Sequence, residues 1–211
     1  MALVSIRELA LLPAGVLALL LMSCSSGPET AERKEPEKAA EPVTGQIALY
    51  RMYQSARAWA PDAEVLRLGS MHLSNEVAQV PGKAAAWEAT FTSAAKSQAR
   101  SYTYSVIEME PNVHKGAFAG PEEAYSGAAG LSEPFLIAAV KVDTDKAYQT
   151  ARTKAADYEK KNPRKPISLL LERTKKFPNP AWRVIWGESA GSSNLSVYVD
   201  ASTGVYLETM H

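Results

Sequence analysis

The chain has 211 residues, and its 23 basic and 23 acidic side chains give a formal net charge of zero. No basic stripe stands out against this balance, which argues against a nucleic-acid-binding protein. A single cysteine excludes disulfides within one chain and makes a cysteine-ligated metal site implausible. The fold must therefore be held by its apolar core alone.

The N-terminus predicts a bacterial signal peptide over residues 1–23. Arg7 stands before the mostly apolar run Leu9–Met22. This run is shorter than the roughly 20 residues that span a bilayer as a helix, but suits a signal peptide. It ends in Leu21-Met22-Ser23-Cys24, which resembles the bacterial lipobox. The resemblance implies cleavage before Cys24 and lipidation of that cysteine; the alternative is an ordinary signal peptide followed by an incidental cysteine.

Residues 24–43 predict a disordered tether that links the lipidated Cys24 to a folded part. This stretch contains Pro28, Pro36 and Pro42, many charges and no aromatic residue. Such a composition buries too little apolar area to offset the entropy of ordering. We therefore expect a cell-envelope protein held to the membrane through Cys24. The residue after the lipidated cysteine, Ser25, resembles the sorting signal of outer-membrane lipoproteins. This resemblance implies that the protein is anchored in the outer membrane and faces the periplasm.

An internal repeat divides the remaining chain into a first unit, 44–134, and a second unit, 135–211. Tyr53-Gln54-Ser55-Ala56-Arg57 recurs as Tyr148-Gln149-Thr150-Ala151-Arg152, an offset of 95 residues (148 − 53). Ala86-Trp87 recurs at the same offset as Ala181-Trp182. Two matches at one offset, with the predicted elements in the same order, favour a duplication.

Each unit is expected to begin with a helix. In the first unit, small and apolar side chains fall at helical spacing before Pro61: Leu49, Tyr53, Ala56 and Ala60. In the second unit, Asp143 or Thr144 can cap a helix that ends at Asn162-Pro163. Its helically spaced residues are Ala147, Ala151, Ala155 and Tyr158.

Side chains that alternate with period two predict antiparallel strands after each helix. In the first unit they are Trp87, Ala89 and Phe91, then Tyr102, Tyr104 and Val106. In the second unit they are Trp182, Val184 and Trp186, then Leu195, Val197 and Val199. The predicted fold class is α+β, with two tandem α-β-β-β units, each an antiparallel sheet packed on one helix.

The second unit resembles the PepSY family over roughly residues 142–207. The resemblance rests on four pieces: Asp145-Lys146-Ala147, a strand near 168–171, Ala181-Trp182-Arg183-Val184, and Asp200-Ala201-Ser202-Thr203-Gly204. The first unit has Glu-Met-Glu-Pro-Asn-Val-His-Lys-Gly (108–116) where the last piece would stand, so it is a degenerate companion. The resemblance implies a non-catalytic secreted or membrane-attached module, thought in some family members to restrain peptidases.

The segment Asp200–Gly204 also predicts a hairpin turn on physical grounds, in which Asp200 accepts backbone hydrogen bonds and Gly204 takes positive φ.

Gly187-Glu188-Ser189-Ala190-Gly191 matches the G-x-S-x-G pattern of serine esterases. A nucleophile elbow needs a helix directly after the serine, and the catalytic acid and histidine follow in that order. Here a polar turn and a period-two strand follow Ser189, and the few residues downstream contain Asp200 in its hairpin turn and His211 at the C-terminus. We therefore interpret 187–191 as a hairpin loop and predict no catalytic residue.

Other candidate sites are also weak. The three histidines, His72, His114 and His211, show no metal-ligand spacing. The acidic pairs Glu108/Glu110 and Glu122/Glu123 are typical of solvated edges. Trp182 and Trp186 could line a ligand or peptide groove, but a sheet core is the favoured interpretation. The basic stretch Glu172–Lys176 could touch lipid head groups, although a solvated strand end is favoured.

These observations predict a non-catalytic, lipid-anchored bacterial envelope protein without metal or cofactor. It would bind or modulate another envelope protein, such as a peptidase. The alternative is a small-ligand carrier that uses the concave sheet face, and a serine esterase acting through 187–191 ranks last.

Overall fold

The computed structural model describes residues 40–73, 77, 80–109, 111–127 and 132–211. The predicted signal peptide, Cys24 and nearly all of the tether lie outside the described residues. The description holds two α-helices and a short 3-10 helix: α1 (Gly45–Trp59), α2 (Thr144–Lys161) and η1 (Ile137–Ala139).

The other regular elements of the described chain are strands. The first six strands are β1 (Val43–Thr44), β2 (Glu64–Met71), β3 (Lys83–Ala84), β4 (Ala86–Ser93), β5 (Gln98–Ser105) and β6 (Gly116–Ala124). The last five are β7 (Ser132–Glu133), β8 (Ile167–Thr174), β9 (Ala181–Trp186), β10 (Ser196–Asp200) and β11 (Tyr206–Met210). The predicted α+β class is confirmed.

Both predicted helices are present, and their ends follow from local chemistry. The α1 helix ends at Trp59, shortly before Pro61, which lacks an amide proton and disfavours helix in the residue before it. The α2 helix begins after Asp143, whose carboxylate accepts a 2.7 Å hydrogen bond from the amide of Thr144. It ends at Asn162, as predicted.

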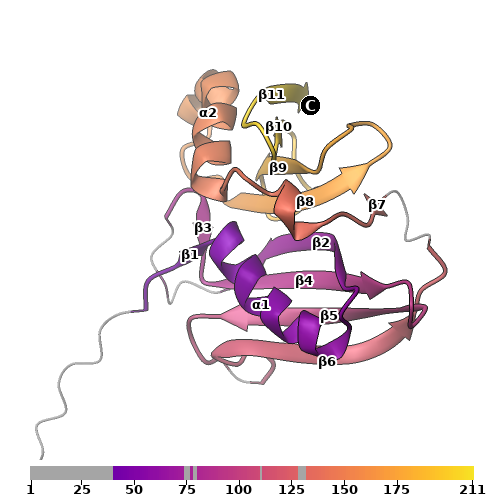
Figure 1. Ribbon diagram of the computed structural model, residues 1–211. Helices are drawn as coiled ribbons and strands as arrows, with labels where there is room; N and C mark the ends of the chain where they lie inside the picture. The colour runs from indigo at the N-terminus through magenta and orange to yellow at the C-terminus, as the bar shows by residue number, and fades with distance from the viewer. Residues whose placement is uncertain (1–39, 74–76, 78–79, 110, 128–131) are drawn as a thin grey trace, which may run out of the picture. The chain divides into compact units, whose positions relative to one another are not determined.

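The main antiparallel sheet has the order β11-β10-β9-β8-β2-β4-β5-β6, and β7 pairs with part of β8 (Figure 1). Strands β1 and β3 form a separate two-stranded antiparallel sheet. The prediction of one sheet per unit is corrected here, because β2 and β8 pair and join the two halves. Each half also contributes four strands to this path, where three were predicted. The join has a physical reason: Leu169, Leu170 and Leu171 are all buried, so β8 is apolar on both faces, as a central strand is.

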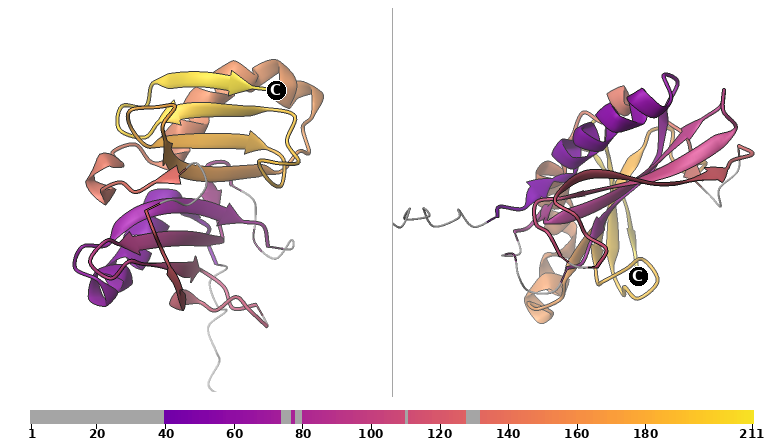
Figure 2. Two further views of the ribbon diagram at one scale, coloured as in Figure 1. Left: turned by 90° about the vertical axis from the view of Figure 1, so that its right-hand side faces the viewer. Right: turned by 90° about the horizontal axis from the view of Figure 1, so that it is seen from below.

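The two helices cover the same face of the sheet. Leu68 on β2 and Leu171 on β8 are direct partners at the join, and both lie in the single apolar core that also holds the buried side chains of α1 and α2. Figure 2 (left) shows β8 to β11 from the opposite face, with α2 behind the strands. The other side of the sheet therefore carries no helix in the described part of the chain.

The helix N-termini meet at the centre of this core. The amides of Gly45 and Gln46, at the start of α1, donate to Thr144 Oγ1 and Asp143 Oδ1 across 2.9 Å each. The Thr144 hydroxyl in turn donates to the carbonyl of Gly82 across 2.5 Å. The first turn of α1 is thus capped by side chains from the start of α2.

Two tryptophans fill equivalent places beneath the helices. Trp87 on β4 and Trp182 on β9 are both fully buried. Each donates its indole N–H to the carbonyl of the residue two positions before its helix, Val43 at 3.3 Å and Val142 at 2.7 Å. Their ring tips approach each other over Gly45, where an added Cβ would lie 2.7 Å from Trp182 and 3.1 Å from Trp87.

Candidate binding site

The two ends of the β2–β8 pair are occupied differently. At the end formed by the start of β2 and the end of β8, an extended segment enters between the strands. Its strand β7 pairs with Arg173 and Thr174 of β8. Its buried Phe135 then exchanges two backbone hydrogen bonds with Val65 of β2, at 2.9 and 2.8 Å. An aromatic side chain on an extended chain therefore fills this end.

At the opposite end, strand pairing stops, and none of the described segments is inserted between the two strands. The last paired residues are Gly69 and Leu170. Beyond them the amide of Leu169 bonds to the Ser70 hydroxyl at 2.9 Å in place of a backbone carbonyl. A pocket of about 240 Å³ opens here. We call this pocket the open slot. Its walls include Ser70 and Met71 of β2, Ile167 and Leu169 of β8, and Tyr148 and Trp186.

Trp186 belongs to the wall of the open slot, and its indole N–H is a donor without a described acceptor. Its side chain is fully buried, and its indole Nε1 has no hydrogen-bond partner among the described residues. Trp182, two residues earlier on the same strand, donates to a carbonyl at 2.7 Å. Buried indole N–H groups usually find an acceptor, and one left without costs about 1–3 kcal/mol. Because this nitrogen is itself buried, it is not part of the surface that the slot offers to an occupant.

Tyr148 and Glu159 of α2 form the polar side of the slot. The Tyr148 hydroxyl donates to Glu159 at 2.5 Å, and Arg152 holds the other carboxylate oxygen at 2.7 Å. Burial, followed by this hydrogen bond to a carboxylate, raises the pKa of Tyr148 to about 12. Burial alone would raise the pKa of Glu159, but hydrogen bonds from Tyr148 and Arg152 outweigh it and lower that pKa. The carboxylate is thus already engaged and stays ionised.

His72 closes another side of the slot through a short polar chain. Its Nε2 lies 2.6 Å from the Ser168 hydroxyl, and that hydroxyl donates to the carbonyl of Gly187 at 2.5 Å. The serine therefore accepts from the imidazole while it donates to the backbone. Because the Ser168 proton is committed to a carbonyl, this pair does not resemble a serine activated by a histidine base. The side chains of Lys83 and Lys165 also line the slot, and both residues are exposed.

Ser189 lies in the loop between β9 and β10. It is exposed, and its hydroxyl is 2.9 Å from that of Ser192 in the same loop. Strand β10 follows, so the hairpin-loop interpretation of 187–191 is confirmed as geometry. Asp200 lies at the far end of β10 and is engaged in its own turn.

Asp200 organises the β10–β11 hairpin, as its turn motif predicted. Its Oδ1 accepts the amides of Ser202 and Thr203 at 2.8 and 2.9 Å, and its Oδ2 accepts from Asn179 at 3.0 Å. Burial alone would raise the pKa of Asp200, but these hydrogen bonds outweigh it and lower the pKa. Gly204 has a φ of +78°, the left-handed conformation expected for the glycine of this turn.

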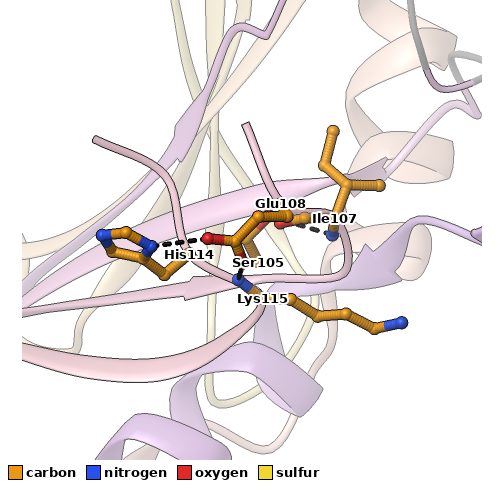
Figure 3. Close-up of polar contacts among 5 residues, drawn as sticks. All are labelled: Ser105, Ile107, Glu108, His114 and Lys115. Carbon is orange, nitrogen blue, oxygen red and sulfur yellow. Dashed lines mark hydrogen bonds and ion pairs between the residues drawn. The ribbon is translucent and has the colours of Figure 1, made fainter. Parts of the chain in front are cut away.

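Glu108 forms a small polar cluster on the loop between β5 and β6 (Figure 3). Its carboxylate accepts from His114 Nδ1 at 2.6 Å and from the amide of Lys115 at 2.7 Å. The amide and then the imidazole lower the pKa of Glu108. Glu110 lies outside the described residues. Among those described, no three His, Cys, Asp or Glu side chains gather closely enough to hold a metal ion.

The remaining predicted residues fall on strands, apart from Lys175 and Lys176, which lie in the turn after β8. Glu122 and Glu123 lie on β6 at one end of the sheet, and Glu122 forms an ion pair of 3.5 Å with Arg100. Within Glu172–Lys176, Arg173 pairs with Glu133 at 3.3 Å and Lys176 pairs with Glu208. Trp182 and Trp186 are both core residues, and Trp186 is also a slot wall.

Sequence reasoning missed the open slot itself. Its β2 and β8 walls come from segments almost a hundred residues apart, and they meet only because the two central strands pair. The one available signal was the run of leucines in β8, which indicates a strand that is buried on both faces and therefore has a neighbour on each side.

Comparison of the chain with protein families, with curated proteins and with solved structures finds no match. The resemblance to the PepSY family therefore stays a prediction. Within the part of the chain that the structure describes, no helix combines the length and the apolar character required to cross a membrane.

Proposed function

We propose that this protein is a non-catalytic, lipid-anchored component of the bacterial cell envelope that binds another envelope protein through the open slot. The observation that carries the binding role is the slot, a pocket of about 240 Å³ at the end of the β2–β8 pair where the described strands stop pairing. The lipobox at Leu21–Cys24 and the tether that follows support the anchored location.

The non-catalytic assignment is supported by the surroundings of the candidate nucleophiles. Ser189 bonds to a neighbouring loop serine, and Ser168 donates to a backbone carbonyl. The only hydroxyl of the two with a histidine beside it is Ser168, and its proton is committed to the Gly187 carbonyl and not to His72. A fluorophosphonate probe should leave Ser189 unlabelled, and Ser189→Ala should keep the wild-type stability and partner binding. Labelling that disappears in Ser189→Ala would contradict this part of the proposal.

We also propose that the two halves arose as tandem PepSY-like units, with the first half degenerate. Matched aromatic contacts support this: Tyr53 packs against Phe91 at 5.9 Å, and Tyr148 packs against Trp186 at 6.4 Å. Both pairs obey the offset of 95 residues seen in the sequence. By the PepSY resemblance, the partner would be a peptidase or another secreted protein.

The binding role is tested by crosslinking in the native envelope. The full-length protein is crosslinked in intact cells, the adduct is identified by mass spectrometry, and the purified partner is titrated calorimetrically against the full-length protein. We expect a stoichiometric complex of two proteins. If a small molecule co-purifies instead and no protein adduct forms, the carrier function is favoured and the proposal is wrong.

A further inference from the structure

The open slot has a counterpart within the same molecule, and that counterpart is filled. An antiparallel strand pair has a local two-fold axis, which here relates Leu68 to Leu171. Rotation about this axis superimposes Arg173 of β8 on Ser70 of β2, and Thr174 on Met71. Arg173 and Thr174 pair with the inserted strand β7, whereas Ser70 and Met71 line the open slot. The two ends of the pair are therefore equivalent positions, of which one is occupied and the other is open in the described part of the chain.

The occupied end shows what such a position accepts. The segment that enters it is extended, pairs by its backbone with both strands and buries Phe135, which is only 3% exposed. The open slot offers a comparable space: a cavity of about 150 Å³ is known to hold benzene, and this one measures about 240 Å³. An aromatic or large aliphatic side chain fits it.

The polar groups of the slot also suit a peptide. Of the described residues that line the slot, Lys83 and Lys165 are basic, and the one acidic residue, Glu159, is already held by Tyr148 and Arg152. The charge that these residues leave for an occupant is positive, which favours an acidic residue close to the apolar one.

We infer that the open slot binds an extended segment of the partner protein, anchored by one large apolar side chain with an acidic residue nearby. The segment enters between the end of β2 and the start of β8, as 132–135 enters at the other end. This rests on the proposed function and adds the chemistry of the recognised segment. Strand addition with a side-chain pocket is an established mode of peptide recognition.

A peptide with the chain's own inserted sequence provides the probe. SEPFLIA, the sequence of residues 132–138, is titrated into the ¹⁵N-labelled full-length protein, with SEPALIA as the matched control. The indole resonances of the four tryptophans are followed, and that of Trp186 is assigned with Trp186→Phe. We expect SEPFLIA to shift the Trp186 resonance in a saturable way and to leave those of Trp87 and Trp182 in place. SEPALIA should bind at least about tenfold more weakly, because it lacks the anchoring ring.

The inference is wrong if SEPFLIA leaves the Trp186 resonance unmoved, or if both peptides shift it equally. It is also wrong if the purified protein already holds a small molecule whose removal moves that resonance. None of these outcomes depends on a partner having been found, so they separate the failure of the slot from the failure of the proposed function.

A blocking variant links the slot to the natural partner. Ile167→Trp places a larger ring in the slot, and Val205→Trp adds the same ring at a turn position that is 60% exposed. Retained folding is checked by amide chemical shifts. We expect Ile167→Trp to weaken binding of the captured partner at least tenfold and Val205→Trp to leave it unchanged. If the partner binds both variants like the wild type, the protein-binding role stands and the slot is not its site.

Discussion

Gly45→Ala should destabilise the protein, although alanine is the better helix former. Gly45 is the first residue of α1, and it has ordinary helical geometry with no positive φ. An added Cβ would lie 2.7 Å from Trp182 Cη2, 2.8 Å from Thr144 Cγ2 and 3.1 Å from Trp87 Cη2. Contacts this short force the neighbours to move, because real Cβ atoms essentially never approach other atoms below about 3.0 Å.

These neighbours have little freedom to move. Both indoles are fully buried, and Trp182 is fixed by its 2.7 Å hydrogen bond to the carbonyl of Val142. Thr144 is held by bonds from the Gly45 amide and to Gly82. Overpacking of a rigid core costs about 1–3 kcal/mol, and the gain in helix propensity returns at most about 1 kcal/mol. We expect a net loss of about 1–2 kcal/mol in the free energy of unfolding.

Urea unfolding followed by tryptophan fluorescence measures this loss, and an unchanged slope with denaturant shows that the folded and unfolded states are otherwise comparable. Gly191→Ala is the matched control, because an added Cβ there meets no atom within 4 Å. The control should stay within about 0.5 kcal/mol of wild type. A Gly45→Ala protein as stable as wild type would refute the packing described at the helix junction.

Three further predictions follow from the core, the slot and the anchor. Trp87→Ala and Trp182→Ala should each lower the free energy of unfolding by about 3–5 kcal/mol in urea titrations, and a cost at only one of them would contradict the equivalent roles assigned to them. The pKa of Tyr148 is about 12 in the folded state, against an ordinary value of 10.0. The contribution of its protonated hydroxyl to the free energy of unfolding is therefore complete below pH 10 and is lost as the pH rises to 12. The unfolding free energy of wild type should therefore fall more steeply over that window than that of Tyr148→Phe, by at most about 2.7 kcal/mol in total, and parallel curves would count against the raised pKa. Cys24→Ser should release the protein from the membrane fraction or leave it unprocessed, whereas unchanged fractionation and migration would show that Cys24 is not the anchor.

Local signals were enough to predict the helices, most strands and the last hairpin. Helical spacing predicted α2, and Asn162-Pro163 predicted where it ends. Asp200 and Gly204 predicted the turn between β10 and β11. Each of these depends on residues close together in the chain. The loop at Ser189 was also predictable, because the polar turn is followed by alternating strand residues.

The join between the halves and the open slot were not predictable in this way. The pairing of β2 with β8 brings together residues about a hundred positions apart, and alternation says which residues share a face but not which strands are neighbours. Trp186 illustrates the limit. It stands at an alternating position with Trp182, yet only one of the two indoles has a hydrogen-bond acceptor in the described structure.

Site-specific photocrosslinking of the full-length protein in intact envelopes tests the central claim most directly. A benzophenone amino acid replaces Met71, which lines the open slot, and in a separate control it replaces the half-exposed Phe118 on β6. We expect one discrete protein adduct from position 71 and none of that mass from position 118. If position 71 yields no protein adduct, or if both positions yield the same one, the open slot is not the binding site.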